Sequence, residues 1–421
     1  MTKLKALNTK LRNLDKRSYQ RLLFLSSVSK DLYNQTNYLV LQYWKYTGSY
    51  LNYNQMDLIM KERINLESEI NYKKLKAGVS QQILKKLDKN YKSFFKSIKD
   101  WKNSKNKYLG VPQPPKYIKE KYYNLIYDFQ RFQVKNSYIQ LEKDLQIPIP
   151  NQLKNQTIKQ IEVIPKYKHF EVVFVYIDKE EYKQIEQNDN VLSIDLGLNN
   201  LATCTSNKNE PFVINGKPLK AVNQYFNKKF GKYKSSLEKR NQKKWSKKLD
   251  LLTQKRNRKI NDYLHKATRK ITNICVKNNI GKVVVGDVKN SLSNINIGKR
   301  NNQNFVNISL GQFVNKLKYK LENHSIECVV VDESYTSKAS FLDNDVLPKK
   351  HNKELKYEFS GKRIQRGLYK SKNSIMINAD VNGAYNILRK AVPNFNVNTL
   401  FDGIEGDFIR NRWLYPHKLT V

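Results

Sequence analysis

Cysteine is scarce in this chain of 421 residues. Its three cysteines, Cys204, Cys275 and Cys328, are widely spaced, and no two of them form a C-x-x-C pair. Disulfide frameworks and structural zinc sites both depend on clustered cysteines, so we expect neither, and this usage is typical of a reducing cytoplasm. Each thiol is most simply interpreted as a small buried apolar side chain.

Long apolar runs are missing as well. No stretch approaches the roughly 20 apolar residues that are needed to span a bilayer, and no apolar signal-peptide core follows Met1. The sequence therefore argues against a membrane protein.

Acidic residues are few compared with basic ones. Asp and Glu number 37 against 78 Lys and Arg, which gives a formal net charge of +41 and a pI near 9.8. Self-repulsion destabilises such a chain unless a polyanion neutralises it, and nucleic acid is the usual polyanion. We therefore expect a nucleic-acid partner and no membrane partner. The oligomeric state does not follow from the sequence.

The first part of the chain is expected to be mainly helical. Residues 21–105 carry apolar side chains at three- and four-residue steps, and the clearest helix is predicted to begin at Ser80 as its N-cap. Lys85 and Lys92 lie on the lysine-rich face of that helix. They are candidates for phosphate contacts, and a solvated helix face is the competing interpretation.

The next part favours strands. After a Pro-rich break near residue 112, residues 106–182 alternate apolar and polar side chains, which predicts a small β-barrel or sandwich, a wedge-like module. Residues 1–20 are expected to add an N-terminal strand to it. Such modules serve many purposes, so this part says little about function.

From residue 188 to 392 strands alternate with helices, an order that suits a mixed sheet of the RNase H type. Two insertions interrupt the pattern, a basic helical one at 217–280 and a loop at 339–375. The tail, 393–421, mixes Phe, Asn, Gly and Asp; it is a candidate for disorder and is assigned no role. The expected fold class is therefore multidomain α+β.

The helical insertion is unusually basic. Between residues 228 and 260 there are 14 Lys or Arg against two acidic residues. A helical pair laid along a nucleic-acid backbone would explain this density, although charge runs are often only solvated faces. The contact candidates in this segment are Lys239, Arg240, Lys243 and Lys244.

Two isolated carboxylates are the most informative feature of the sequence. Asp195 follows the apolar run 191–194 at a predicted strand end, and Asp380 starts an amphipathic helix. Hard divalent cations such as Mg²⁺ prefer oxygen ligands, so the pair suits a metal site, and in so basic a chain the substrate would be a phosphodiester. Taken singly, each Asp is equally explained as a turn or N-cap residue.

These residues resemble those of the TnpB family, the transposon-encoded RNA-guided DNA nucleases related to type V CRISPR effectors. Residues 194–197, Ile-Asp-Leu-Gly, match the first RuvC motif of that family. Residues 380–387, Asp-Val-Asn-Gly-Ala-Tyr-Asn-Ile, match the third, usually written D-x-N-A-A-x-N-I. Residues 335–338 resemble the segment that leads into a zinc ribbon.

The resemblance implies an RNase H-like (RuvC) nuclease domain behind a helical recognition region and a β-module. It implies an RNA-guided, Mg²⁺-dependent endonuclease that cuts double-stranded DNA next to a short target-adjacent motif. Its partners would be a guide RNA from the transposon end and the target DNA. We would then expect it in the bacterial cytoplasm, at the nucleoid.

The chain departs from the family pattern at the second motif, where a strand ordinarily ends in Glu. Gly286 stands at that place, with Asp287 one residue beyond it. Alternation along a strand would turn Asp287 to the opposite face, whereas Glu333, at the end of the next predicted strand, would lie about 4.8 Å away across the sheet. We expect Glu333 to replace the missing ligand. Asp287, Asp332 and the absence of any third ligand stay open as alternatives.

The second departure concerns zinc. The interval from Lys338 to Asp380 contains no cysteine, Ser340 stands where a first cysteine would be, and His351 alone cannot hold a structural zinc ion. We expect no zinc there and instead a basic loop that touches RNA or DNA. Its contact candidates are Lys338, Arg363 and Arg366.

Three functions compete. In the first, Asp195, Glu333 and Asp380 hold two Mg²⁺ ions for hydrolysis of DNA, and no catalytic histidine is required. In the second, the lost second-motif Glu marks a nuclease-dead RNA-guided DNA-binding repressor. The third is a DDE-type transposase, which would bind transposon ends without RNA.

Overall fold

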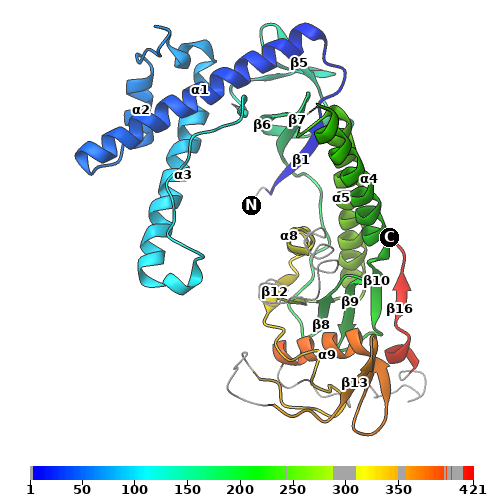
Figure 1. Ribbon diagram of the computed structural model, residues 1–421. Helices are drawn as coiled ribbons and strands as arrows, with labels where there is room; N and C mark the ends of the chain where they lie inside the picture. The colour runs from blue at the N-terminus through cyan, green and yellow to red at the C-terminus, as the bar shows by residue number, and fades with distance from the viewer. Residues whose placement is uncertain are drawn as a thin grey trace. The chain divides into compact units, whose positions relative to one another are not determined.

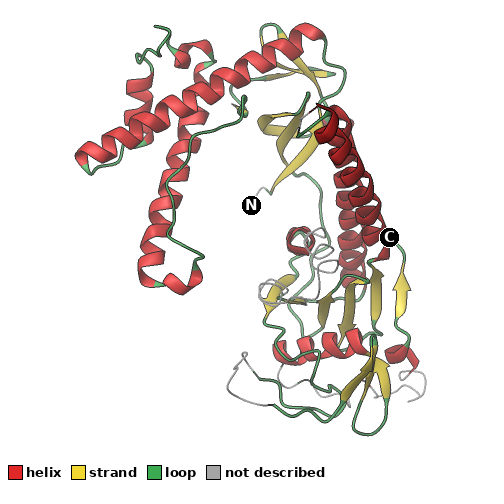
Figure 2. Cartoon of the chain, viewed as in Figure 1, coloured by secondary structure: helices red, strands yellow, loops and turns green. Residues whose placement is uncertain are grey.

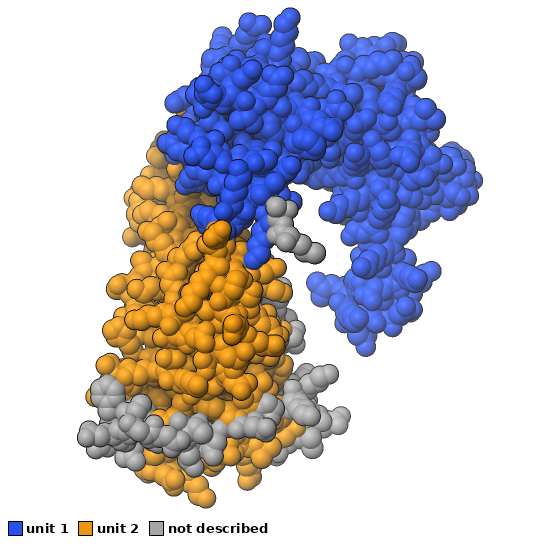
Figure 3. All heavy atoms as spheres, turned by 180° about the vertical axis from the view of Figure 1, so that it is seen from behind, with its two compact units in different colours: residues 1–180 blue, residues 181–421 orange. Residues whose placement is uncertain are grey.

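The chain folds into two compact units, residues 1–180 and 181–421 (Figure 3). The computed structural model describes residues 3–241, 244–287, 310–348, 357–392, 395, 400 and 411–421. Helices and sheets occur in both units, so the protein is a multidomain mixed α/β chain (Figure 2). Among the described helices, none is long and apolar enough to cross a membrane.

Long helices make up much of the first unit (Figure 1). They are α1 (Lys16–Thr47), α2 (Tyr53–Met60) and α3 (Ala77–Asn103), with short 3-10 turns at Asn71–Lys74, Lys105–Lys107 and Asn151–Leu153. Helix α1 begins after Asp15, whose carboxylate accepts a hydrogen bond from the Ser18 N–H at 2.8 Å. It ends at Gly48, whose φ of 69° is the left-handed conformation that glycine adopts most readily.

The start of α3 differs from the prediction. The helix begins at Ala77, three residues before the expected N-cap. Ser80 is fully buried, and its hydroxyl donates to the Tyr72 carbonyl at 2.8 Å. A serine satisfied by tertiary contact looks the same in sequence as a serine cap, and this similarity misplaced the boundary.

The strands of the first unit form two sheets. One is wholly antiparallel in the order β1-β7-β6-β2, and the other is the meander β3-β4-β5. The strands are β1 (Leu4–Lys10), β2 (Leu125–Asp128), β3 (Gln133–Val134), β4 (Tyr138–Glu142), β5 (Leu145–Pro148), β6 (Thr157–Lys166) and β7 (His169–Ile177). Alternating residues of β6 and β7, such as Ile161 and Phe174, pack with α1 and α3 into one core.

A mixed six-stranded sheet organises the second unit, in the order β12-β11-β8-β9-β10-β16 (Figure 1). Strands β8, β9 and β10 are antiparallel, β11 and β12 run parallel to β8, and β16 runs parallel to β10. The strands are β8 (Val191–Leu196), β9 (Asn200–Ser206), β10 (Phe212–Asn215), β11 (Lys282–Gly286), β12 (Glu327–Val331) and β16 (His417–Leu419).

Helices cover both faces of this sheet. Helices α5 (Lys247–Lys277) and α8 (Leu310–Glu322) pack on the face that carries Val283 and Val285. Helix α9 (Ala379–Ala391) packs on the face that carries Val284. Because side chains alternate along a strand, each residue of β8 and β11 belongs to one face or the other, and this assigns the functional candidates to a side.

The basic insertion is a helical pair, with α4 (Lys217–Asn241) preceding α5. Helix α5 begins after Ser246, whose hydroxyl accepts a hydrogen bond from the Leu249 N–H at 3.3 Å. The thiols of Cys204 and Cys275 lie in the α5 core, and burial raises the pKa of both. All three cysteines are free.

The end of the tail is ordered, in contrast to the expectation of disorder. Residues 417–419 add β16 to the sheet, and Trp413 is 1% exposed. The Trp413 ring packs edge-on against Phe341, with the ring centroids 5.3 Å apart. The tail carries a single large aromatic anchor, which periodicity does not reveal.

Removing this anchor is expected to destabilise the second unit. Replacing Trp413 with alanine should cost about 3–5 kcal/mol of unfolding free energy, because a large aromatic side chain leaves a cavity in the core. Tyr415→Ala is a matched control, since Tyr415 is 68% exposed and should change stability by less than about 0.5 kcal/mol. Urea denaturation of both variants tests the prediction; equal stabilities would show that the tail is not part of this core.

Candidate functional site

Asp195 lies near the end of β8, on the face of the sheet that α9 covers. Two residues earlier on the same face, the Ser193 hydroxyl donates to the Ala384 carbonyl of α9 at 2.7 Å. The carboxylate also meets α9, because a Cβ built on Gly383 would lie 2.8 Å from Asp195 Oδ2. A glycine at this point of α9 therefore lets the helix approach the carboxylate closely. The family motif has alanine at this position, a difference that sequence comparison passed over.

Gly286 ends β11 beside Asp195. Val285 is in register with Ile194, so Gly286 is the neighbour of Asp195 one step further along the parallel pair. A Cβ at Gly286 would lie 2.7 Å from Glu333 Oε2 and 2.9 Å from Ile387 Cδ1 of α9. The Glu333 carboxylate thus occupies the space that a side chain at 286 would fill. The sequence substitution and the displaced carboxylate are two sides of one packing arrangement.

Asp380 sits in the first turn of α9 and is capped from both sides. The Asn378 side chain caps the helix by accepting from the Asp380 N–H at 2.9 Å. The Asn200 amide of β9 donates to Asp380 Oδ2 at 2.7 Å, and Arg363 Nη2 lies 3.8 Å from Oδ1. Helix α9 therefore delivers its carboxylate to the same sheet face as Asp195.

Electrostatics places the three carboxylates in one field. The pKa of Asp195 is raised well above its usual value, first by burial and then by the negative charges of Asp380 and Glu333, while Arg363 opposes the shift. Three carboxylates that repel one another in a dry environment are stabilised by a bound cation, as hard divalent ions are in oxygen-rich sites.

The fit to a metal has a limit in the geometry. Among the residues that the structure describes, no three His, Cys, Asp or Glu side chains gather closely enough to hold an ion as they stand. The contacts of Asp380 with Asn200 and Arg363 account for part of this, since both compete for its oxygens. The residue types and their shared face suit a divalent cation, and the Arg363 pair would have to open to admit one.

The two weaker ligand candidates are engaged elsewhere or point elsewhere. The Asp332 carboxylate accepts from the Ser334 N–H at 3.0 Å and lies 3.3 Å from Lys390 Nζ. Burial would raise its pKa, but those partners outweigh burial and lower it. Asp287 continues the ladder through its N–H, which donates to the Val331 carbonyl. By alternation its side chain faces away from the Gly286 side.

The two asparagines of the Asp380 motif hold a loop in place. Asn386 donates to the carbonyls of Thr336 and Ala339 at 2.9 and 2.7 Å, and Asn382 donates to Ala339 at 2.8 Å. Both side chains are fully buried. They tie the segment after Glu333 to α9, so they position that carboxylate indirectly. Motif matching found these residues but gave no reason for them.

The cysteine-free insertion forms a small antiparallel sheet. Its strands are β13 (Lys362–Gln365), β14 (Leu368–Lys370) and β15 (Met376–Asn378). The Asp345 carboxylate accepts from the N–H groups of Ser340 and Ser360, at 2.7 and 3.2 Å, and so joins the two ends of the insertion. Arg363 on β13 reaches Asp380. Lys349, Lys350 and His351 lie outside the described residues.

Of the predicted nucleic-acid contacts, Arg363 is the one that the structure brings to the carboxylates. Lys92 pairs with Asp88 at 2.7 Å, and Lys85 lies over the Tyr53 ring. The remaining described candidates are exposed, namely Lys239, Arg240, Lys244, Lys338 and Arg366. Lys243 lies outside the described residues.

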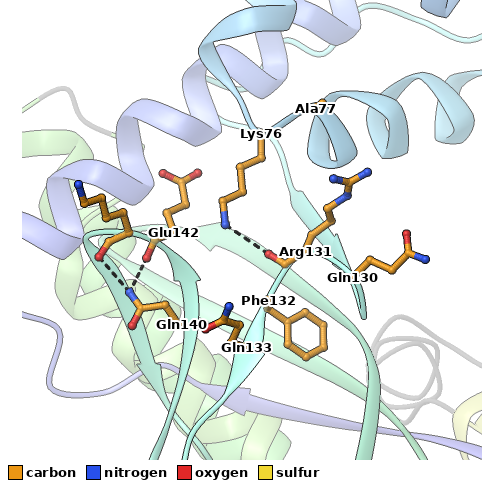
Figure 4. Close-up of a pocket in the computed structure, with 9 residues that line it drawn as sticks. Lys76, Ala77, Gln130, Arg131, Phe132, Gln133, Gln140 and Glu142 are labelled. Atoms are coloured by element: carbon orange, nitrogen blue, oxygen red, sulfur yellow. Dashed lines mark hydrogen bonds between the residues drawn. The ribbon is translucent and has the colours of Figure 1, made fainter.

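The first unit holds a polar pocket that the sequence did not indicate. Its volume is about 510 Å³, and it lies between the start of α3 and the β3-β4-β5 sheet (Figure 4). Lys76 points into it and donates to the Arg131 carbonyl at 3.4 Å. Gln140 donates to the Lys143 carbonyl on the far wall. Residues 76 and 131–143 are too far apart in sequence for a pattern to connect them.

Two protein families match the second half of the chain. Residues 173–292 match the family described as a probable transposase, OrfB_IS605. Residues 311–387 match the Cas12f1-like TNB domain. These segments contain Asp195 and Gly286 in the first case and Glu333 and Asp380 in the second. No curated protein matches the chain.

Solved structures resemble the chain over most of its length. A Cas12f1–sgRNA–target DNA complex matches with a TM-score of 0.53 and 17% identity, covering 92% of this chain and 98% of that one. A CRISPR-Cas12f ternary complex matches at a TM-score of 0.34 and 18% identity, covering 89% and 85%. The first likeness defines a class: this is a multidomain mixed α/β protein with the fold of Cas12f1. With the two family matches, the chain is a TnpB-like protein related to type V effectors.

Proposed function

We propose that the protein is an RNA-guided, Mg²⁺-dependent endonuclease that cuts double-stranded DNA beside a short target-adjacent motif. One observation carries the proposal: the Glu333 carboxylate fills the space above Gly286, on the sheet face that also presents Asp195 and Asp380. The second unit would then be an RNase H-like (RuvC) domain whose second-motif ligand comes from β12 instead of β11.

The chain's own residues set up the chemistry. Asp195 is fixed by β8 and by close contact with Gly383, while Glu333 is fixed by the loop that Asn382 and Asn386 hold. Two bound Mg²⁺ ions would supply an activated water and stabilise the leaving 3′ oxygen. Arg363 is placed to contact the substrate phosphate once it leaves Asp380. No histidine is needed, because the carboxylates serve as ligands.

The partners follow from the relatives and the charge. The matched Cas12f1 structure holds an sgRNA and a target DNA, and the net charge of +41 suits two polyanions. A guide transcribed from the transposon end would select the target by base pairing, while protein side chains read the duplex shape. The exposed lysines of α4 and the pocket of the first unit are the surfaces proposed to carry that backbone.

Two other functions make different demands. A nuclease-dead repressor would keep RNA-dependent DNA binding and lack cutting, and its motivation weakens because Glu333 occupies the gap that Gly286 leaves. A DDE-type transposase would bind transposon ends without RNA.

One experiment separates the three functions. The protein is co-expressed with its flanking non-coding DNA, purified, and assayed for DNA binding and cutting with and without RNase and EDTA. The proposal expects RNase to abolish binding and EDTA to abolish cutting alone. RNase-resistant binding would support the transposase, and binding without cutting in Mg²⁺ would support the repressor.

A further inference from the structure

A cationic pocket lies between α5 and α8, on the face of the sheet opposite the carboxylates. It is open and has a volume of about 440 Å³. Its lining is dominated by positively charged side chains and contains no carboxylate side chain, and the residues that form it are His265, Lys266, Arg269, Lys270, Asn273, Tyr319, Lys320 and Val421.

Lys320 is a buried charge in this pocket. It is 5% exposed, and its ammonium donates to the His265 carbonyl at 2.6 Å and to the Thr268 hydroxyl at 2.7 Å. Burial lowers its pKa to about 8, and the charges of Arg269 and Lys316 lower it further. At neutral pH the side chain is still mainly protonated. The charged neighbours that act on it are thus positive, and burial of such a group without an anion is costly.

The neighbouring groups do not neutralise it. Lys316 Nζ lies 2.9 Å from His265 Nε2, and burial with the nearby lysines lowers the pKa of His265 to about 4. His265 is therefore neutral and acts as an acceptor. Asp262 is the acid near His265; it pairs with Lys266 at 3.0 Å and is 64% exposed. The pocket keeps a surplus of positive charge.

We propose that this pocket holds a backbone phosphate of the bound guide RNA, an inference that rests on the proposed function. The cation cluster with an amide at Asn273 is a phosphate-binding set, and an aromatic ring, Tyr319, stands at its rim. The DNA strand to be cut must reach the carboxylates on the α9 face. A phosphate on the α5–α8 face therefore belongs to a different strand, and the guide is the other polyanion of the complex.

A matched pair of double variants tests this. Arg269→Gln with Lys316→Gln removes one pocket charge from each helix, while Lys277→Gln with Lys318→Gln removes one charge from each helix outside the pocket. We measure equilibrium binding of the co-purified RNA to RNA-stripped protein over a series of salt concentrations. The pocket variant is expected to bind about 10-fold more weakly, with a log–log salt slope reduced by about 1.4–1.8, and the control to change less than about twofold.

The outcomes separate the two proposals. If the wild-type protein binds no RNA, the proposed function fails. If it binds RNA and the two double variants behave alike, the pocket assignment alone is wrong. If the pocket variant keeps RNA binding but its RNA-loaded form loses target-DNA binding, the phosphate is from DNA and the assignment is also overturned.

Lys320→Met provides a second test that does not depend on the surface charges. It removes a buried charge with an apolar side chain of similar length, so the RNA-free protein should melt about 2–4 °C higher. Inorganic phosphate should raise the melting temperature of the wild type but not of Arg269→Gln with Lys316→Gln. An unchanged or lower melting temperature for Lys320→Met, or equal phosphate effects, would contradict an anion site.

Discussion

Replacing Glu333 with alanine is expected to abolish DNA cleavage while RNA loading stays intact. Glu333 approaches Asp195 closely enough to raise the pKa of that carboxyl, and its oxygen rests on Gly286. Loss of a residue that merely orients a metal ligand already costs about 10–100-fold, so loss of a ligand should lower the single-turnover cutting rate by more than about 100-fold. The measurement is cleavage of a guide-matched duplex by RNA-loaded protein in Mg²⁺.

Asp332→Ala is the matched control, since it removes the adjacent carboxylate. Asp332 pairs with Lys390 and accepts from Ser334, so its removal should leave cutting within about tenfold of the wild type. If Asp332→Ala abolishes cutting and Glu333→Ala does not, the ligand assignment is reversed. If both variants cut normally, the third ligand is absent from this strand end.

Gly286 is expected to be intolerant of a side chain for a reason that concerns Glu333. A Cβ at this position would stand 2.7 Å from Glu333 Oε2, so Gly286→Ala must displace the carboxylate. A displacement of about 1 Å can lower the rate about 100-fold. We expect the variant to fold, because the displaced atom is the flexible end of a side chain, and to cut DNA poorly. Circular dichroism and the single-turnover assay together measure both effects.

The stronger test exchanges the two positions. In the double variant Gly286→Glu with Glu333→Ala, the new side chain enters the space that Glu333 leaves, on the face that Asp195 and Asp380 share. Cutting should return to within about 100-fold of the wild-type rate, whereas Gly286→Glu alone should be inactive through crowding. A double variant as inactive as Glu333→Ala would show that 286 no longer addresses the reaction centre.

The carboxylate positions were accessible from sequence because each ends a strongly patterned element. Asp195 follows a buried run and Asp380 caps an amphipathic helix, and the structure puts both on one face. Glu333 was chosen by strand adjacency, and its approach to Gly286 agrees with that choice. Its catalytic role remains a prediction.

The interactions that sequence missed join distant segments. Arg363 reaches Asp380 from an insertion strand, and His265 meets Lys316 from another helix. Neither pair shares a periodic pattern, so the chain must fold before it is visible. The tail was misjudged for a similar reason, since one buried ring, that of Trp413, orders it.

Cutting of a plasmid library with randomised flanks beside a guide-matched target tests the account most directly. With RNA-loaded wild-type protein and Mg²⁺, we expect cut molecules to share the guide-matched sequence and one short flanking motif. Omission of the metal should leave every molecule intact. Tight RNA-dependent binding to the same molecules with no cutting, at any flank or metal concentration, would contradict the account and make the protein a repressor.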